Sequence, residues 1–340
     1  MFFASDNAAP VPPEVMAALA EANTGFPSSY GTDQLSDRAH DLLREVLEAP
    51  EASVQFVTTG TAANALALAA LCPPWGAVIC HRHAHIAEDE CGAPEFFSHG
   101  AKLVLAEGAH GRMTPETLSA VLAQTGESGV HGVQRGALSL TNVTEAGTVY
   151  SAAQTAGLAG LARAKGMPVH LDGARFANAV VATGAAPADL TWRAGVDALS
   201  FGGTKVGLMG VEAVVMFDPA RDWELQLRRK RAGHLVSKSR YLAAQIVAML
   251  DGGRWLHWAA HANAMAARLV EGLVARGAGL THPVEANILF PHWAPGTSAR
   301  LRAAGARFYD MPAPEGQEGA RLVTSWATTE ADVDGFLALI

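Results

Sequence analysis

Residues 168–175 are Pro168-Val169-His170-Leu171-Asp172-Gly173-Ala174-Arg175. The apolar run is typical of a buried strand, and the carboxylate falls where this strand ends. In parallel α/β sheets, ligands bind at the carboxyl ends of the strands. Asp172 can there pair with a protonated ring nitrogen, and the Arg175 guanidinium can fork onto a carboxylate ligand. The alternative interpretation is a structural ion pair between Asp172 and Arg175.

Strand-like and helical patterns alternate on both sides of this stretch. Helices are expected from Pro12 and Pro13, from Ser36, over 62–71 and over 151–165. The expected strands are 54–57, 77–80, 102–105, 137–140, 169–171, 198–201 and 213–217. This alternation predicts an α/β fold with a mostly parallel central sheet that helices cover on both faces.

The pattern changes after Tyr241 to two long helical stretches, a few short strands and a closing helix. We therefore expect a large domain at 1–250, which includes an N-terminal arm, and a smaller C-terminal α+β domain at 251–340.

A second motif, Thr59-Gly60-Thr61-Ala62-Ala63-Asn64, lies between an expected strand and an expected helix. Backbone N–H groups at a helix N-terminus attract phosphate, a glycine lets the anion approach closely, and threonine hydroxyls add donors. The alternative is an ordinary capped helix start.

A third motif, Ser200-Phe201-Gly202-Gly203-Thr204-Lys205-Val206-Gly207, places a lysine among small and apolar residues. Burial lowers the pKa of a lysine and makes its amine nucleophilic, as Schiff-base chemistry requires. The spacing does not fit a P-loop.

Composition narrows the class of partner. The chain has 340 residues, 49% of them hydrophobic and 17% charged, with a net charge of −8. These values indicate a packed globular protein, and they favour neither nucleic acid nor a membrane as partner. Three cysteines without a CxxC pair, and a start that lacks the pattern of a secretory signal, suggest reduced thiols in the cytoplasm.

These motifs occur in the order phosphate turn, aspartate and lysine, and the whole chain resembles the low-specificity L-threonine aldolases. Besides the three motifs, the resemblance rests on Ala4-Ser5-Asp6-Asn7, Tyr30-Gly31-Thr32-Asp33, Ala84-His85, Glu90-Cys91-Gly92-Ala93-Pro94-Glu95 and Arg321-Leu322-Val323-Thr324-Ser325-Trp326. It implies the fold of the fold-type-I enzymes that depend on pyridoxal 5'-phosphate.

The resemblance also implies a role for each matching residue. Lys205 would hold the cofactor as a Schiff base, Asp172 would pair with its pyridine nitrogen, Gly60 and Thr61 would bind its phosphate, and His85 would stack on its ring. The substrate carboxylate would be held by Ser5, Arg175 and Arg321. His131 falls near the position of a second family histidine beside the substrate hydroxyl.

Two departures from the better-known branch of the family affect these expectations. The segment Thr141-Asn142-Val143-Thr144-Glu145 differs from that branch, so that substrate preference could differ as well. The basic stretch 228–231 and Lys238 stand where that branch provides a phosphate-binding arginine from the neighbouring subunit. We expect a homodimer or homotetramer in which Tyr30 and Lys238 reach the partner's cofactor; the alternative is a solvated basic surface.

Thirteen histidines raise the question of a metal site. His81, His83 and His85 alternate and would share one face of a strand, and His257 and His261 have helical spacing. A zinc site needs three or four converging ligands, and Trp258 stands where a zincin motif has its glutamate. No metal is expected.

The expected activity is cleavage of L-threonine, L-allo-threonine or other β-hydroxy-α-amino acids such as phenylserine to glycine and an aldehyde. His85 and His131 are the candidate bases at the β-hydroxyl, with an ordered water between them as a further option. One rival is another lyase on the same scaffold, either a β-eliminating enzyme or a glycine hydroxymethyltransferase relative. A non-catalytic binding protein is a rival of another class, against which Lys205 and Asp172 both argue.

Overall fold

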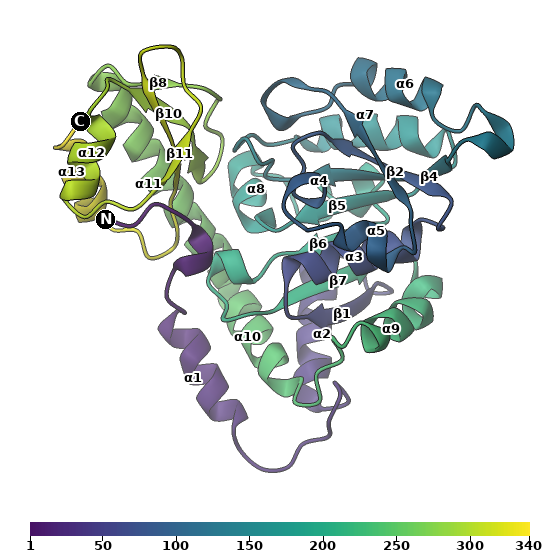
Figure 1. The fold of residues 1–340 in the computed structure, drawn as a ribbon. Coiled ribbons are helices and arrows are strands. Elements are labelled where there is room, and N and C mark those ends of the chain that lie inside the picture. The colour runs from purple at the N-terminus through teal and green to yellow at the C-terminus, as the bar shows by residue number, and fades with distance from the viewer.

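The computed structural model describes all residues 1–340, in two bodies that are each built around a sheet (Figure 1). The larger sheet has seven strands, and the smaller has five at the C-terminal end of the chain. The expected α/β architecture with an additional small α+β domain is confirmed.

The helices are α1 (Pro13–Ala22), α2 (Gln34–Val46), α3 (Gly60–Leu71), α4 (His85–Glu88), α5 (Ala93–Phe97), α6 (Pro115–Gln124), α7 (Ala152–Arg163), α8 (Phe176–Thr183), α9 (Asp222–Arg231), α10 (Arg240–Leu250), α11 (Arg254–Ala275), α12 (Thr297–Ala303) and α13 (Glu330–Leu337). The strands are β1 (Ser53–Val57), β2 (Gly76–His81), β3 (Lys102–Ala106), β4 (Gln134–Thr141), β5 (Val169–Gly173), β6 (Ala198–Phe201), β7 (Glu212–Met216), β8 (Gly279–Leu280), β9 (Ile288–Leu289), β10 (Pro291–Trp293), β11 (Tyr309–Met311) and β12 (Glu318–Val323). No helix has both the length and the apolar composition that crossing a bilayer would require.

The large sheet has the strand order β1-β7-β6-β5-β4-β2-β3. Strands β3, β2, β4, β5 and β6 run parallel, whereas β7 is antiparallel to both of its neighbours. Strand β7 can run antiparallel because it follows β6 through the short lysine loop rather than through a crossover helix. The carboxyl ends of the parallel strands therefore lie along one edge of the sheet.

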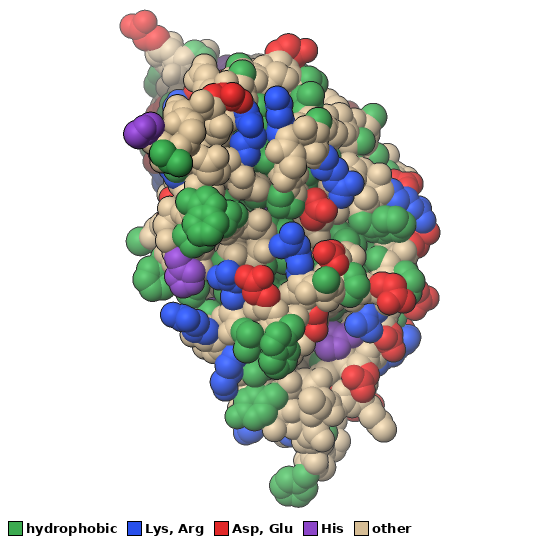
Figure 2. All heavy atoms as spheres, turned by 90° about the vertical axis from the view of Figure 1, so that its right-hand side faces the viewer, with side chains coloured by type: hydrophobic (Ala, Val, Ile, Leu, Met, Phe, Trp, Pro, Cys, Tyr) green, Lys and Arg blue, Asp and Glu red, His purple; other side chains and the backbone are tan.

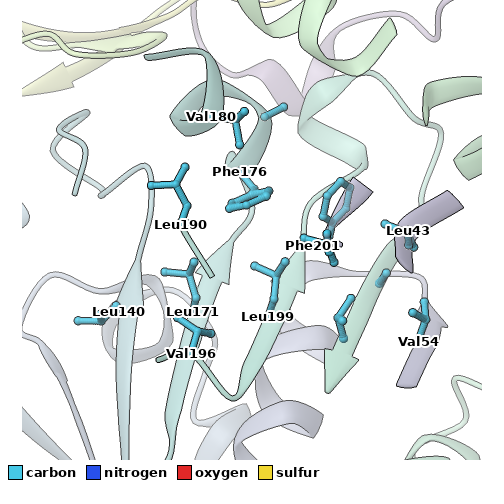
Figure 3. Packing of buried hydrophobic residues seen from close by; sticks show 14 of the residues in the cluster. Leu43, Val54, Leu140, Leu171, Phe176, Val180, Leu190, Val196, Leu199 and Phe201 are labelled. Carbon is cyan, nitrogen blue, oxygen red and sulfur yellow. The ribbon is translucent and has the colours of Figure 1, made fainter. Parts of the chain in front are cut away.

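Strict alternation along the strands separates two apolar layers. Leu140, Leu171 and Leu199 lie on neighbouring strands in the larger layer, which Phe176 of α8 also joins (Figure 3). Residues that alternate with them, such as Ala198 and Val214, face α3 in the second layer. Asp172 alternates with Leu171, so its side chain belongs to the α3 side of the sheet.

The small domain includes the N-terminus of the chain. The backbone of Phe3 exchanges hydrogen bonds with Arg307 and Val323, and its ring is fully buried against Phe336. Figure 1 shows the N-terminal segment beside the C-terminal domain. The boundary expected near residue 250 thus leaves the arm on the wrong side, because an apolar residue at position 3 does not reveal which core will bury it.

Helix α11 joins the two bodies. Trp255 and Ala259, in its first turns, pack in the large core, whereas Leu269 and Leu273 pack in the small one. With 22 residues the helix is about 33 Å long, enough to span both cores. Helix α11 therefore contributes side chains to both cores.

Candidate active site

A cavity of about 450 Å³ lies at the carboxyl ends of the parallel strands. It is lined by Asn7, Thr58, Thr59, Gly60, Thr61, Asn64, His85, Asp89, Asp172, Ala174, Thr204, Lys205, Met209, Gly210 and Glu212. The structure thus brings the three motifs together, although 145 positions separate Gly60 from Lys205 in the sequence. Lys205 is the only lysine or arginine among the lining residues.

Lys205 lies in a short 3-10 helix, Thr204–Val206, directly after β6. A Cβ on Gly202 would collide with the backbone of Ala174, so this position requires glycine. Glu212 of β7 accepts a 2.6 Å hydrogen bond from the Gly203 N–H and a second bond from the Thr204 side chain. Burial raises the pKa of Glu212. The buried carboxyl group holds the lysine loop against the sheet.

Asp172 belongs to a buried polar chain that ends at His85. Asn64 Nδ2 donates to Asp172 Oδ2 at 2.9 Å and to Glu90 Oε1 at 2.8 Å. Glu90 Oε1 is also 2.7 Å from His85 Nδ1. The Ala174 N–H donates to the other Asp172 oxygen at 2.9 Å. This hydrogen-bond network fixes the Asp172 carboxylate and leaves Nε2 of His85 without a protein partner.

The His85–Glu90 pair retains its proton to a higher pH than separate side chains would. The bond to Glu90 raises the pKa of His85, and burial raises the pKa of Glu90. Because Glu90 is fully buried while His85 is 29% exposed, the carboxyl group acts behind the ring, and the ring faces the cavity.

The phosphate turn has the expected form. Thr59 is the N-cap of α3, and its hydroxyl accepts a 3.1 Å hydrogen bond from the Ala62 N–H. Gly60 is the first residue of the helix, and a Cβ built there would meet no atom within 4 Å. The helix N-terminus therefore opens into free space at the position where an anion would bind.

These residues fit pyridoxal 5'-phosphate. The cavity offers an amine at Lys205, a carboxylate at Asp172, a ring at His85 and an open anion-binding turn at Gly60 and Thr61. Two buried oxygens, Asn64 Oδ1 and Glu90 Oε2, have no hydrogen-bond partner within the chain. Unsatisfied buried polar atoms are rare in proteins, and they mark a place where a further group can bind.

A buried layer behind Asp172 had no role in the sequence-based expectations. His170 lies between Ser139 Oγ and Ser200 Oγ, each 2.9 Å from one of its ring nitrogens. Burial lowers the pKa of His170 to about 4, so the ring is neutral. A neutral ring with two partners supports the Asp172 strand without adding charge.

The two arginines that were expected to bind the substrate carboxylate differ in the partners that they have within the protein. Arg175 is buried and makes a two-point ion pair with Asp6, through Nε at 2.7 Å and Nη2 at 2.9 Å. Burial alone would raise the pKa of Asp6, but Arg175 outweighs it and lowers this pKa. The alternative pair of Arg175 with Asp172 is therefore not formed, and Asp6 already occupies the fork of Arg175.

Arg321 is the freer guanidinium. Its Nη2 donates to the Ala4 carbonyl at 3.2 Å, the group stacks on Tyr309 at 4.9 Å, and its buried Nε has no partner. Ser5 is close by in sequence, and its hydroxyl caps a 3-10 turn by accepting from the Asn7 N–H.

His131 does not reach the cavity of its own chain. It is exposed in a 3-10 helix, Gly129–His131, three residues before β4 begins. Thr141, at the far end of this strand, is the residue that pairs with Asp172. Eight strand residues span about 26 Å, so the expectation for His131 is wrong for the subunit that carries it. The expectation rested on the distance in sequence between His131 and β4. That distance places His131 before the strand begins, at the edge of the sheet opposite to Asp172.

Tyr30 and Lys238 also lie outside this cavity, but they lie close to each other. The Tyr30 N–H donates to the Ser237 carbonyl at 2.9 Å, and Lys230 Nζ is 5.3 Å from the Tyr30 ring. Both Tyr30 and Lys238 are exposed. Tyr30 and Lys238 therefore share a surface that lies outside the cavity of their own chain.

The histidines that suggested a metal site do not form one. Of His81, His83 and His85, only His81 lies in a strand; His83 is in a turn and His85 begins α4, so they do not share a strand face. His257 and His261 are exposed on α11, and His261 contacts the Thr328 carbonyl. No three histidine, cysteine or acidic side chains converge as metal ligands.

A second cavity of similar size adjoins the first, and Asp89 lines both. It lies between the two domains and is lined by His83, Glu88, Asp89, Gly108, His110, Gly111, Glu145, Ala146, Thr281, His282, Phe290, Met311, Pro312 and Arg321. A group held at Lys205 can therefore extend towards Arg321 and Glu145. The sequence provided no pattern that connects these loops.

A parallel sheet whose strand ends bring a half-buried lysine, a carboxylate and an anion-binding helix start into one cavity defines a pyridoxal-phosphate enzyme of fold type I. The β-eliminating lyase family profile matches residues 3–294, and this chain belongs to that family. The family resemblance that the motifs indicated is confirmed.

Two curated relatives match nearly the whole chain. A low specificity L-threonine aldolase of Pseudomonas aeruginosa is 44% identical over 96% of this chain and 93% of the relative. Another, from a Pseudomonas species, is 42% identical over 97% of this chain and 94% of the relative. A solved threonine aldolase of Leishmania major superposes with a TM-score of 0.94 at 30% identity, covering 99% of this chain and 98% of that one.

Proposed function

We propose that this chain is a pyridoxal-phosphate-dependent aldolase that cleaves β-hydroxy-α-amino acids to glycine and an aldehyde. Its substrates would be L-threonine, L-allo-threonine and related compounds such as phenylserine. The observation that carries the proposal is the convergence of Lys205, Asp172 and His85 in one cavity. The relatives with threonine aldolase activity in their names support the choice of reaction.

Each residue of the cavity has a proposed task. The chemistry that pyridoxal 5'-phosphate supplies, when bound through Lys205, is an electron sink for the breaking Cα–Cβ bond. Asp172 keeps a proton on the ring nitrogen, because a buried carboxylate fixed by Asn64 stabilises the adjacent positive charge. Gly60 and Thr61 bind the phosphate at the start of α3. His85 covers the ring, and Glu90 fixes its orientation.

The substrate carboxylate binds at Arg321, whose Nε is buried without a partner and whose Nη2 contacts the carbonyl of Ala4, the residue before Ser5. Arg175 contributes through its charge, or by exchanging Asp6 for the substrate. Holding the carboxylate at these residues would limit the rotation of the substrate and orient its Cα–Cβ bond for cleavage.

A substrate panel tests the reaction. Purified enzyme with pyridoxal 5'-phosphate should release equal amounts of glycine and aldehyde from threonine, allo-threonine and phenylserine diastereomers. The alternative is β-elimination, the reaction named in the family's description. It would release ammonia and a keto acid. Ammonia and keto acid without glycine would overturn the aldolase proposal. A protein that binds no cofactor and shows no band near the visible region would instead be a binding protein.

We further propose a homodimer or homotetramer in which Tyr30 and Lys238 complete the neighbour's phosphate site. The phosphate turn of the chain has no lysine or arginine of its own except Lys205. Trp223 and Leu227 of α9 are 68% and 53% exposed. Figure 2 shows one face of the molecule on which apolar and basic side chains intermingle. Exposed apolar patches of this kind mark protein–protein contacts.

The three cysteines are free thiols. A reducing compartment maintains thiols in this state, and we propose the cytoplasm as the location.

A further inference from the structure

Cleavage of a β-hydroxy-α-amino acid requires a group that accepts the β-hydroxyl proton. His131 lies at the wrong end of β4 for this task. The loop at the correct end is the one that follows β4, at residues 142–150.

This loop is held rigidly. The Asn142 N–H donates to the Asp172 carbonyl at 2.9 Å, and the Asn142 side chain exchanges two hydrogen bonds with the backbone of Tyr150. Thr144 and Thr148 bond to each other through both backbone and side chains. The loop is therefore closed at its base, directly beside Asp172, and its tip is formed by 145–147.

Glu145 is the charged residue at this tip. Its side chain is half-buried, lines the inter-domain cavity together with Arg321, and makes no hydrogen bond or ion pair within the chain. It is close enough to His85 and Arg175 to help raise the pKa of each. A carboxylate in such surroundings is available to a bound ligand.

Most other acidic groups of the two cavities are engaged elsewhere. Glu88 bonds to His83 at 2.9 Å, Asp172 bonds to Asn64 and to the Ala174 N–H, and Glu212 bonds to the lysine loop. Asp89 is also free, but it is exposed at the end of α4. Glu145 is the unengaged carboxylate that the rigid loop holds near His85, Arg175 and Arg321.

We propose that the Glu145 carboxylate is the catalytic base that accepts the β-hydroxyl proton of the substrate. This inference rests on the proposed aldolase function and goes beyond it by assigning the base to a residue other than histidine. His85 then serves to cover the ring and orient the reacting group.

The hydroxyl proton moves to a Glu145 oxygen, and the O–H electron pair becomes the second bond of the aldehyde carbonyl. The Cα–Cβ bond breaks, and its electron pair remains with the Cα fragment. Glu145 then loses its proton to solvent, and Cα takes up one proton to give glycine.

Glycine itself provides a reaction that does not need this base. It has no β-hydroxyl, and we expect its α-proton to exchange with solvent at the same site. We expect Glu145→Gln to lower kcat for threonine and phenylserine cleavage about 100-fold or more, as loss of a general base does. The exchange of the glycine α-proton in D2O, followed by NMR, should keep its wild-type rate, and so should the glycine dissociation constant, measured by titration of the cofactor absorbance.

Three variants serve as comparisons. Glu145→Asp retains a carboxylate and should recover part of the cleavage rate. Asp89→Asn should affect cleavage less than Glu145→Gln. Glu107→Gln removes a surface carboxylate that pairs with Arg82 and should behave as wild type.

Two results would overturn the inference. The first is cleavage at the wild-type rate in Glu145→Gln, or a greater loss in Asp89→Asn. The second is an equal loss of cleavage, glycine exchange and glycine binding, which would make Glu145 a counter-ion of the arginines. Absence of glycine release by the wild-type enzyme would instead refute the aldolase function itself.

Discussion

At the scale of single residues, the two arginines assigned to the substrate carboxylate differ in what they already bind. Arg175 is neutralised by Asp6 inside the protein, whereas Arg321 has an unsatisfied buried Nε beside the inter-domain cavity. Removing one member of a buried ion pair leaves the other charge uncompensated. The two arginines should therefore respond differently to substitution.

Arg321→Ala should raise KM for the amino acid about tenfold or more, because a charge-assisted contact contributes about 1.5–3 kcal/mol. Steady-state kinetics on threonine test this expectation, with cofactor affinity as an internal control that should not change. Arg175→Ala should instead lower the free energy of unfolding by about 3–5 kcal/mol, measured by denaturant titration. An unchanged KM in Arg321→Ala would place this residue outside the site.

The His85–Glu90 pair makes a prediction about pH. Hydrogen bonding to Glu90 raises the pKa of His85 above the 6.5 of a free histidine. Since the folded-state pKa is the higher one, the contribution of the protonated ring to stability is complete below pH 6.5 and is lost as the pH rises through the raised pKa. Glu90→Gln should lower the pKa of His85 and reduce the decrease in stability that accompanies rising pH.

NMR titration of the imidazole resonances measures the effect directly. Glu88→Gln is the matched control, because Glu88 bonds to His83 rather than His85. If His85 titrates alike in the wild type and in Glu90→Gln, the hydrogen bond to Glu90 does not control its protonation.

The sequence identified the residues of the cavity that belong to motifs, but not those that only spatial contacts define. Asp172, Lys205 and Gly60 could be predicted because each follows a strand within a recognisable turn. Glu212 is the first residue of the apolar strand β7, and the segment that contains Glu145 indicated only a possible change in substrate preference. Asn64 is one helical turn after Gly60, and this spacing could have placed it on the cavity side of α3.

At the scale of elements, the start of α3 combines a stable helix cap with an open anion site. Gly60 adopts an ordinary helical conformation, and a Cβ built on it would have no neighbouring atom within 4 Å. The fold itself therefore does not require glycine at this position. What requires it is the space that a phosphate would occupy.

Gly60→Ala should leave the free energy of unfolding unchanged or raise it by about 0.4–1 kcal/mol, because alanine restricts the unfolded chain. The added methyl group should at the same time weaken binding of pyridoxal 5'-phosphate about tenfold or more, as overpacking of a tight site does. Absorbance titration and denaturant unfolding measure the two effects separately.

Gly157→Ala is the matched control for this substitution. Gly157 lies in α7, where a Cβ would also meet nothing within 4 Å. It should show the same change in stability with no change in cofactor affinity. Equal cofactor affinity in Gly60→Ala and Gly157→Ala would mean that the phosphate does not approach Gly60.

Element starts were predicted well where local chemistry determines them. Pro13 begins α1, and Ser151 caps α7. Helix α3 begins at Gly60, two residues before the expected start at 62, with Thr59 as its N-cap. Helix α2 begins at Gln34 rather than at Ser36, because Asp33 is its N-cap and accepts from the Ser36 N–H at 3.0 Å. The direction of β7 could not be predicted, since apolar alternation is the same for parallel and antiparallel strands.

At the scale of the whole molecule, the site requires one charge that its own chain does not place there. A phosphate at Gly60 and Thr61 would have hydroxyl and backbone donors but no cation apart from Lys205. Tyr30 and Lys238 lie on a surface outside the cavity, with the basic residues of α9 nearby. A neighbouring subunit that places this surface over the cavity would supply the missing charge.

Mixing two inactive variants tests this arrangement. A Lys205→Ala chain lacks the attachment lysine, and a Lys238→Ala chain lacks the proposed phosphate cation. If Lys238 acts across the interface, a hybrid dimer contains one intact site, with Lys205 from one chain and Lys238 from the other. Co-refolding of the two should then restore up to half of the activity per hybrid dimer. If both residues act within one chain, every site of the hybrid lacks one of them, so that proven hybrids without activity would assign Lys238 to its own subunit. A fully active Lys238→Ala parent would show that the phosphate does not depend on this lysine.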